Sequence, residues 1–148
     1  MTIPPTKLLL LDTTILVDLM RDTPTGRKID RDFRLSARPE RPLLCSIVEG
    51  EILGVARYRG WGEKMMADLQ ALFDQLVRVP SSHHAVIDAY ATIYADAHRN
   101  GFPRGENDLW IAATAKATNA AVLTSDNDFL WLNGRHIDVH HVPVVLSR

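Results

Sequence analysis

Residues 8–16 read LLLLDTTIL. Four consecutive leucines that end at an aspartate are typical of a short strand in a parallel sheet, because helices cover both faces of such a strand and leave it no polar side. The apolar residues that follow, 15–20, predict a short helix. A buried strand that leads directly into a helix favours an α/β fold.

The same alternation continues along the rest of the chain. Short apolar runs predict further strands at residues 43–45, 77–79, 121–124 and 137–141, of which the last is expected at an edge of the sheet. Helical patterns occur at residues 27–38, 46–57, 61–76, 83–98 and 108–118. Strands that alternate with helices predict a three-layer α/β/α domain with a central parallel sheet. The lack of repeats and linkers favours a single domain over residues 1–148.

The bulk composition is that of an ordinary globular protein, with 46% hydrophobic and 24% charged residues among 148. No apolar run approaches the ~20 residues that span a bilayer, so we expect no association with a membrane. Residues 1–7 lack the apolar stretch of a signal peptide, which favours a cytoplasmic protein. The single cysteine, Cys45, excludes an internal disulfide and a thiolate metal site, so a metal site would depend on oxygen ligands.

Positive charge is concentrated in one stretch, although the net charge of the whole chain is only -1. The cationic residues of this basic stretch outnumber its acids, and they are Arg21, Arg27, Lys28, Arg31, Arg34, Arg38 and Arg41. Two interpretations stay open. The stretch is either a solvated helix face with local ion pairs or an arm that contacts phosphates.

Two aspartates follow predicted strands directly. Asp12 comes at the end of the first strand, and Asp126 lies just past the strand at 121–124. Because parallel α/β sheets bind ligands beyond the carboxyl ends of their strands, we expect both side chains at the same rim of the sheet. Each aspartate alone is also explained as a helix cap or a turn residue.

A third acid, Asp108, opens the alanine-rich helix. Ile111, Ala112 and Ala115 lie three, four and seven residues further on, and therefore share its face of the helix. This face is expected to pack on the sheet, where an unpaired carboxylate costs several kcal/mol. A metal ion would supply the missing partner.

The helix predicted at 46–57 offers two glutamates. Ser46 and Glu49 match a capping box, in which the glutamate reaches back to the start of the helix. Glu51 falls within the apolar stripe beside Val48 and Val55, where a glutamate needs a cation. We therefore favour Glu51 as the functional acid, while the choice between Glu49 and Glu51 stays open.

Four carboxylates at one rim would repel one another until a cation neutralised them. Oxygen ligands are those that the hard cations Mg²⁺ and Mn²⁺ prefer. Such ions support phosphodiester hydrolysis without a nucleophilic side chain.

With these residues identified, three segments of the chain resemble the PIN-domain family and, within it, the VapC-like toxin ribonucleases of type II toxin–antitoxin systems. Residues 8–16 look like the opening strand of the family. Residues 48–54, VEGEILG, are similar to its T-x-x-E-L-x-x-G helix. Residues 107–115 and 123–129, NDLWIAATA and LTSDNDF, are similar to its D-x-x-I-A-A and T-x-D-x-D-F pair.

The resemblance implies a metal-dependent endoribonuclease toxin that uses Mg²⁺ (or Mn²⁺). It also implies an RNA substrate, a cognate antitoxin and a homodimer. The metal-binding and catalytic quartet that it implies is Asp12, Glu51, Asp108 and Asp126. Asp128 is interpreted as a cap or supporting residue, and Thr14 stands where the family commonly has asparagine.

Two other functions compete with this one. A receiver-type phosphoacceptor domain would need a further aspartate after the third strand and a lysine near the carboxyl end, and neither is present. A catalytically inactive PIN-like binding module is disfavoured by the complete set of four acids.

Overall fold

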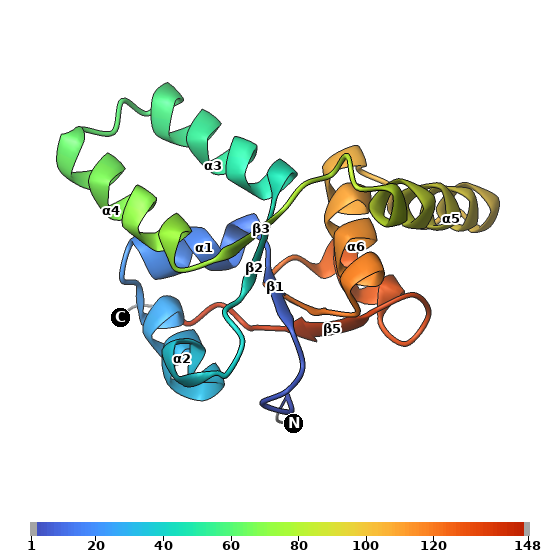
Figure 1. Cartoon of the computed structure of the whole chain (residues 1–148), viewed down its shortest axis with the longest axis horizontal. Coiled ribbons are helices and arrows are strands. Elements are labelled where there is room, and N and C mark those ends of the chain that lie inside the picture. Colours follow the sequence, from blue (N-terminus) through green and yellow to red (C-terminus); the bar gives the residue numbers. More distant parts are fainter. Residues whose placement is uncertain (1–2, 147–148) are drawn as a thin grey trace.

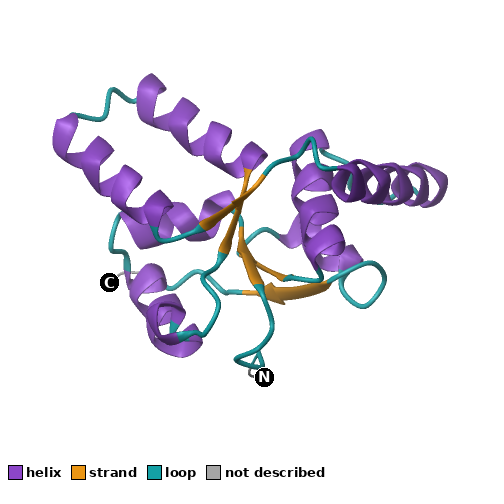
Figure 2. Ribbon diagram, in the orientation of Figure 1, coloured by secondary structure: helices purple, strands orange, loops and turns teal. Residues whose placement is uncertain are grey.

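The computed structural model describes residues 3–146 and confirms the α/β/α architecture with a central parallel sheet (Figures 1 and 2). Within these residues five parallel strands form the sheet, in the order β3-β2-β1-β4-β5. The strands are β1 (Leu9–Leu11), β2 (Leu43–Cys45), β3 (Val77–Val79), β4 (Ala121–Thr124) and β5 (Asp138–His141). The short apolar runs of the sequence therefore locate every strand of the sheet.

The helices form two groups, one on each face of the sheet. One group contains α1 (Thr13–Met20), α2 (Pro24–Phe33), α3 (Ser46–Tyr58) and α4 (Glu63–Asp74); the other contains α5 (His84–Asn100) and α6 (Glu106–Thr118). Figure 1 shows the two groups on opposite sides of the strands, with α5 packed against α6. Right-handed crossovers explain the separation, because the chain moves outward from β1 to β3 and then returns to β4 on the other side of β1.

This return makes the boundary between β1 and β4 the topological switch point of the sheet. The two strands pair in register, with Leu9 opposite Ala121 and Leu11 opposite Leu123. All of their residues are buried. Loops that leave neighbouring strands in opposite directions open a crevice at such a point, and ligands of parallel sheets bind there.

One predicted helix has the wrong bounds. The segment expected at 27–38 begins earlier, because Thr23 caps α2 by accepting a hydrogen bond from Gly26 N (3.0 Å) and Pro24 takes the first helical position. A proline fits there because the first residues of a helix need no N–H partner. The helix ends at Phe33, and a short 3-10 turn, η1 (Leu35–Ala37), follows it.

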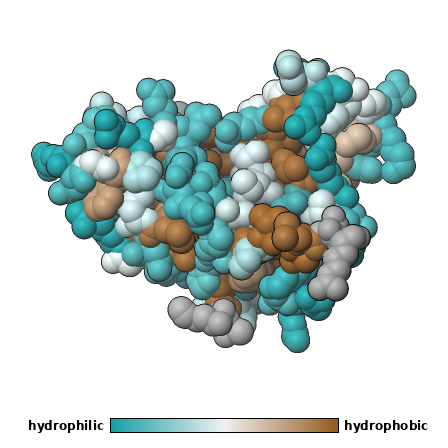
Figure 3. Space-filling view, turned by 180° about the vertical axis from the view of Figure 1, so that it is seen from behind, coloured by the Kyte–Doolittle hydropathy of each residue, from teal (hydrophilic) through white to brown (hydrophobic). Residues whose placement is uncertain are grey.

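A second 3-10 segment, η2 (Asn127–Leu132), joins β4 to β5 and was not predicted. It packs against α6 and β5. Phe129 and Leu132, its buried residues, anchor it in the core, so the acidic loop at its start is held in place. On the face seen in Figure 3, hydrophobic surface is confined to separate patches between hydrophilic side chains.

Candidate active site

Asp12 occupies the carboxyl end of β1 and is almost completely buried, with 3% of its surface exposed. It caps α1, since its Oδ1 accepts hydrogen bonds from Ile15 N (3.1 Å) and Thr14 Oγ1 (2.6 Å). The Thr124 hydroxyl donates to the other carboxylate oxygen. Burial nevertheless raises the pKa of Asp12, because removal from water outweighs these hydrogen bonds. Asp12 is thus both a helix cap and a carboxylate that would gain from a nearby cation.

Asp126 lies just past β4, at the rim that Asp12 shares. It caps η2 through a hydrogen bond from Asp128 N to its Oδ1 (2.9 Å), and its own N–H donates to Thr124 Oγ1 (2.9 Å). Thr124 therefore connects the two acids, donating to Asp12 and accepting from Asp126. One hydroxyl on β4 fixes the relative positions of both.

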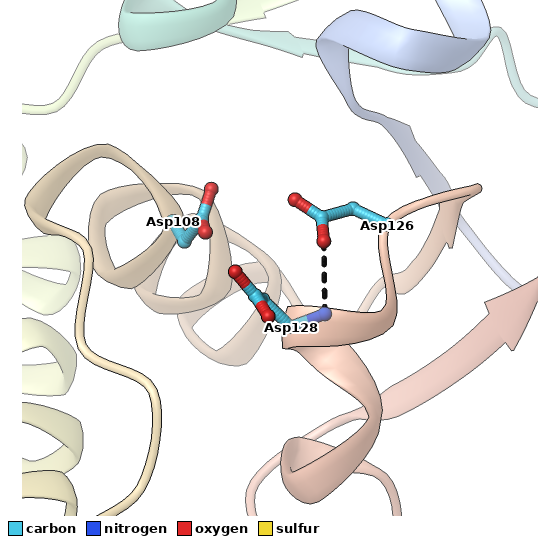
Figure 4. Close-up of side chains that lie close together, drawn as sticks. All are labelled: Asp108, Asp126 and Asp128. Carbon is cyan, nitrogen blue, oxygen red and sulfur yellow. Dashed lines mark hydrogen bonds between the residues drawn. The ribbon is translucent and has the colours of Figure 1, made fainter.

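Asp108 comes from the first turn of α6 and approaches the rim from the side (Figure 4). A carboxylate oxygen of Asp108 lies within 4.8 Å of oxygens from both Asp126 and Asp128. The pKa of Asp108 is raised to about 6, first by burial and then by the charges of Asp126, Asp128, Glu51 and Asp12. The charges of these four acids all act on Asp108, and among residues 3–146 no ion pair offsets them.

Glu51 and Glu49 have different surroundings, although both are on α3. Glu51 accepts hydrogen bonds from Thr13 Oγ1 (2.9 Å) and Asn107 Nδ2 (3.3 Å), and its charge acts on Asp108. Glu49 forms an ion pair with Arg78, whose Nε lies 2.8 Å and 3.0 Å from its two oxygens. Glu51 therefore lies near Asp108, whereas Glu49 is paired with Arg78 of β3. Asp12, Glu51, Asp108 and Asp126 are called the rim acids below.

The predicted capping box is wrong. Cys45, not Ser46, precedes the first turn of α3, and no side chain caps it. Ser46 instead accepts a hydrogen bond from Ser81 N (3.3 Å), while Glu49 turns toward β3. The pairing of Glu49 with Arg78 is a tertiary contact, which the local spacing of Ser46 and Glu49 cannot reveal.

The fold that carries these acids has counterparts among known proteins. The family model described as PIN domain matches residues 9–132, most of the chain. The chain belongs to the PIN-domain family. The family predicted by resemblance is therefore confirmed. No curated protein sequence matches the chain.

Solved structures similar to this PIN domain include toxin–antitoxin complexes. VapBC2 from Rickettsia felis, bound to a DNA fragment from its promoter, superposes with a TM-score of 0.77 at 21% identity, covering 90% of this chain and 98% of that one. DNA-bound VapBC from Salmonella typhimurium gives 0.75 at 20% identity over 92% and 98%. FitAcB from Neisseria gonorrhoeae gives 0.69 at 25% identity over 89% and 96%. These similarities agree with the PIN-domain fold of the chain.

Asp128 is the acid of this PIN domain that the sequence interpretation undervalued. It was expected to be a cap or supporting residue, yet its carboxylate lies in the cluster with Asp108 and Asp126 (Figure 4). The 3-10 turn of η2 brings Asp126 and Asp128 to the same side. The available signal was the repeated aspartate in residues 125–128, SDND, next to a strand end.

The donor set fits a hard divalent cation. All candidate ligands are carboxylate oxygens. Mg²⁺ and Mn²⁺ prefer oxygen ligands, whereas Zn²⁺ also binds the nitrogen of histidine and the sulfur of cysteine. Neighbouring hydroxyl and amide groups of Thr13, Thr14 and Asn107 orient these carboxylates, as supporting residues do around metal sites. Thr14 contributes a hydroxyl at the position where the family commonly has an amide.

Of the helices in residues 3–146, none combines the length and the apolar character needed to cross a membrane.

Proposed function

We propose that this PIN domain is a metal-dependent endoribonuclease that serves as the toxin of a toxin–antitoxin pair. The observation that carries the proposal is the cluster of Asp108, Asp126 and Asp128 at the switch point of the sheet, where the nearby charges of Glu51 and Asp12 also help to raise the pKa of Asp108 to about 6. An acid cluster of this kind costs folding free energy unless a cation neutralises it, which favours a functional explanation.

Each residue has a defined part in the proposed site. The four acids would hold Mg²⁺ or Mn²⁺, with Asp128 beside them. When bound, such a cation activates water and stabilises the leaving oxygen in phosphodiester hydrolysis. Thr13 and Asn107 hold the Glu51 carboxylate toward the rim, and Thr124 aligns Asp12 with Asp126.

The choice of RNA as substrate rests on the resemblance to VapC-like toxins. The antitoxin partner is supported by the neighbours, which are VapBC and FitAcB complexes. A homodimer, as the family resemblance implies, completes the proposal. The PIN-domain match removes the reason for considering a receiver domain, and the complete set of acids disfavours an inactive binding module.

The test is cleavage of total cellular RNA by the purified chain with Mg²⁺ or Mn²⁺, beside EDTA controls. We expect discrete fragments that disappear with chelator and with either Asp12→Asn or Asp108→Asn. Circular dichroism of both variants checks that they fold. Absence of cleavage by folded, antitoxin-free protein with both metals would overturn the ribonuclease proposal and leave a binding module.

A further inference from the structure

A cavity of about 880 Å³ opens beside α2, within the range of roughly 300–1,000 Å³ that is usual for small-molecule sites. Its walls come from residues 3–5, from residues between 28 and 38, and from residues 141–143 after β5. Figure 1 shows α2, the N-terminal segment and the chain beyond β5 in the lower part of the molecule. None of the rim acids lines this cavity, so it is separate from the candidate active site.

The walls carry a concentrated positive charge. Lys28, Arg31, Arg34 and Arg38 line the cavity together with one carboxylate, Asp32. Four cationic side chains and one carboxylate give the walls of the cavity a net charge of +3, although the net charge of the whole chain is -1. Part of the basic stretch seen in the sequence therefore surrounds a concave surface instead of covering a plain solvated helix face.

The cations differ in how far they are already engaged. Arg38 donates to the carbonyl oxygens of Pro4 (2.7 Å) and Lys7 (2.6 Å), so it holds the N-terminal wall in place. Lys28 and Arg31 share Asp32, at 2.8 Å and 3.4 Å, and Arg31 remains largely exposed. Their single shared carboxylate leaves most of their hydrogen-bonding capacity for a ligand.

Arg34 is the cation with the most unusual setting. It follows α2 with φ 49° and ψ 51°, a left-handed conformation that glycine or asparagine usually adopts after a helix. Its guanidinium forms no ion pair with any acid of residues 3–146. An arginine therefore lines the cavity from a position that backbone preference alone would give to glycine.

The remaining walls are apolar except for His141. Phe33 is partly buried against the core, and Pro4, Pro5 and Pro143 add rigid apolar surface. A bare inorganic anion would make no use of these walls. A ligand with a planar apolar part and a charged phosphate would use both, because guanidinium groups match phosphate oxygens and apolar side chains contact a base or sugar.

We propose that this cavity binds a nucleoside phosphate, with Arg31 and Arg34 at the phosphate and Phe33 with the neighbouring prolines at the base or sugar. A free nucleotide and a nucleotide unit of an RNA strand share this chemistry. The site requires neither a divalent cation nor the rim acids.

Isothermal titration calorimetry in EDTA tests the proposal with AMP, a 5′-phosphorylated RNA tetranucleotide and inorganic phosphate as separate titrants. We expect AMP or the tetranucleotide to bind wild-type protein. The double variant Arg31→Gln/Arg34→Gly, whose glycine suits the left-handed backbone, should weaken binding about tenfold or more, since it removes two charge-assisted contacts. Arg31→Gln alone provides a variant with an unaltered backbone at residue 34.

Arg21→Gln is the matched control, because Arg21 belongs to the basic stretch but does not line the cavity. Equal binding of AMP and the tetranucleotide would identify a free nucleotide as sufficient, and binding of the tetranucleotide alone would identify an RNA strand. The proposal is overturned if neither binds, if inorganic phosphate binds as tightly as AMP, or if Arg21→Gln weakens binding as much as the double variant. Asp108 does not line the cavity, so the Asp108→Asn variant should bind AMP or the tetranucleotide as tightly as wild type does. This result is expected even if the wild-type protein shows no ribonuclease activity.

Discussion

Asp108 and Asp96 are both partly buried aspartates on helices that pack against each other, yet their surroundings are opposite. Asp108, on α6, faces the acids of the rim, which together with burial raise its pKa to about 6. Asp96, on α5, is surrounded by donors, and its pKa is held well below its usual range by hydrogen bonds from Arg135 and His136.

The contacts of Asp96 account for this difference. Arg135 donates from Nε (2.6 Å) and from its terminal nitrogen (2.8 Å), a two-point contact that suits a planar guanidinium. His136 Nε2 lies 2.6 Å from the same carboxylate, and Asn100 Nδ2 donates at 2.6 Å. The protein therefore supplies this acid with all of its partners, and the acid connects α5 to the turn before β5.

The acids at the rim of the sheet, unlike Asp96, have only uncharged hydrogen-bond donors from residues 3–146 around them. They receive hydrogen bonds from hydroxyl and amide groups, which orient them but bring no positive charge. Glu49, two residues before Glu51 on α3, pairs with Arg78, whereas no ion pair of Glu51 occurs within residues 3–146. An acid paired with an internal cation contributes to the fold, whereas a group of acids that lacks such a partner is the arrangement that a bound cation would stabilise.

The largest effect is expected from separate glutamine substitutions of the two glutamates of α3, Glu49 and Glu51. Glu51→Gln should reduce RNA cleavage by about 100-fold or more, as loss of a charge that acts on the transition state does. Glu49→Gln should leave cleavage nearly unchanged, because Glu49 is paired with Arg78 outside the rim. Rates measured under identical Mg²⁺ concentrations decide the matter. Equal losses in both variants would show that internal pairing does not separate functional from structural acids here.

Asp128 should have an intermediate effect. Its carboxylate lies in the cluster, so Asp128→Asn is expected to weaken Mn²⁺ binding about tenfold, the loss typical of groups that support a metal site. Glu106→Gln is the control, since Glu106 lies in the same first turn of α6 as Asp108 but outside the cluster. Calorimetric titration with Mn²⁺ gives both affinities. If Asp128→Asn binds Mn²⁺ like wild type, the residue is only a neighbour of the site.

Asp108→Asn should stabilise the metal-free protein while it abolishes activity. Between its ordinary value of 3.8 and about 6, folded Asp108 binds more protons than the unfolded chain, so the free energy of unfolding falls as pH rises through this window. Above it the variant should be more stable by about 1–2 kcal/mol, allowing for partial exposure to solvent.

Urea denaturation in EDTA at pH 4 and pH 7 measures this difference. The variant's advantage in free energy of unfolding should be small at pH 4 and present at pH 7. Added Mg²⁺ should reduce this advantage, because it should stabilise wild type alone. Asp88→Asn, an exposed aspartate on α5, provides the control for loss of a surface charge. A variant less stable than wild type at pH 7 would mean that Asp108 already has a stabilising partner.

Much of this contrast was accessible from the sequence, because strand ends and helix faces are local properties. The apolar runs located the strands, and the shared direction of strands in a parallel sheet predicted that Asp12 and Asp126 lie at one rim. The apolar neighbours of Asp108 and Glu51 predicted that both acids face inward. These inferences depend only on side-chain periodicity and on the direction of parallel strands.

The features that were missed depend on tertiary contacts or on ambiguous local signals. Arg78 reaches Glu49 from 29 residues away, so the spacing of Ser46 and Glu49 suggested a cap that does not form. Asp128 joins the cluster through a 3-10 turn that hydrophobic periodicity does not reveal. Pro24 is compatible with either the end or the start of a helix, and the cap from Thr23 decides for the start.

The smallest effect is expected at Asp96, where the acid already has its partners. Because its folded pKa is lowered, the carboxylate contributes stability above pH 3.8 that is lost as pH falls toward the folded value. Asp96→Asn should therefore lower Tm modestly at pH 7 and differ less from wild type at pH 3, with Asp88→Asn unchanged at both. Mg²⁺ should not alter the difference, in contrast to Asp108→Asn. A response of the Asp96 variant to Mg²⁺ would show that the contacts between α5 and the turn before β5 also position the rim acids.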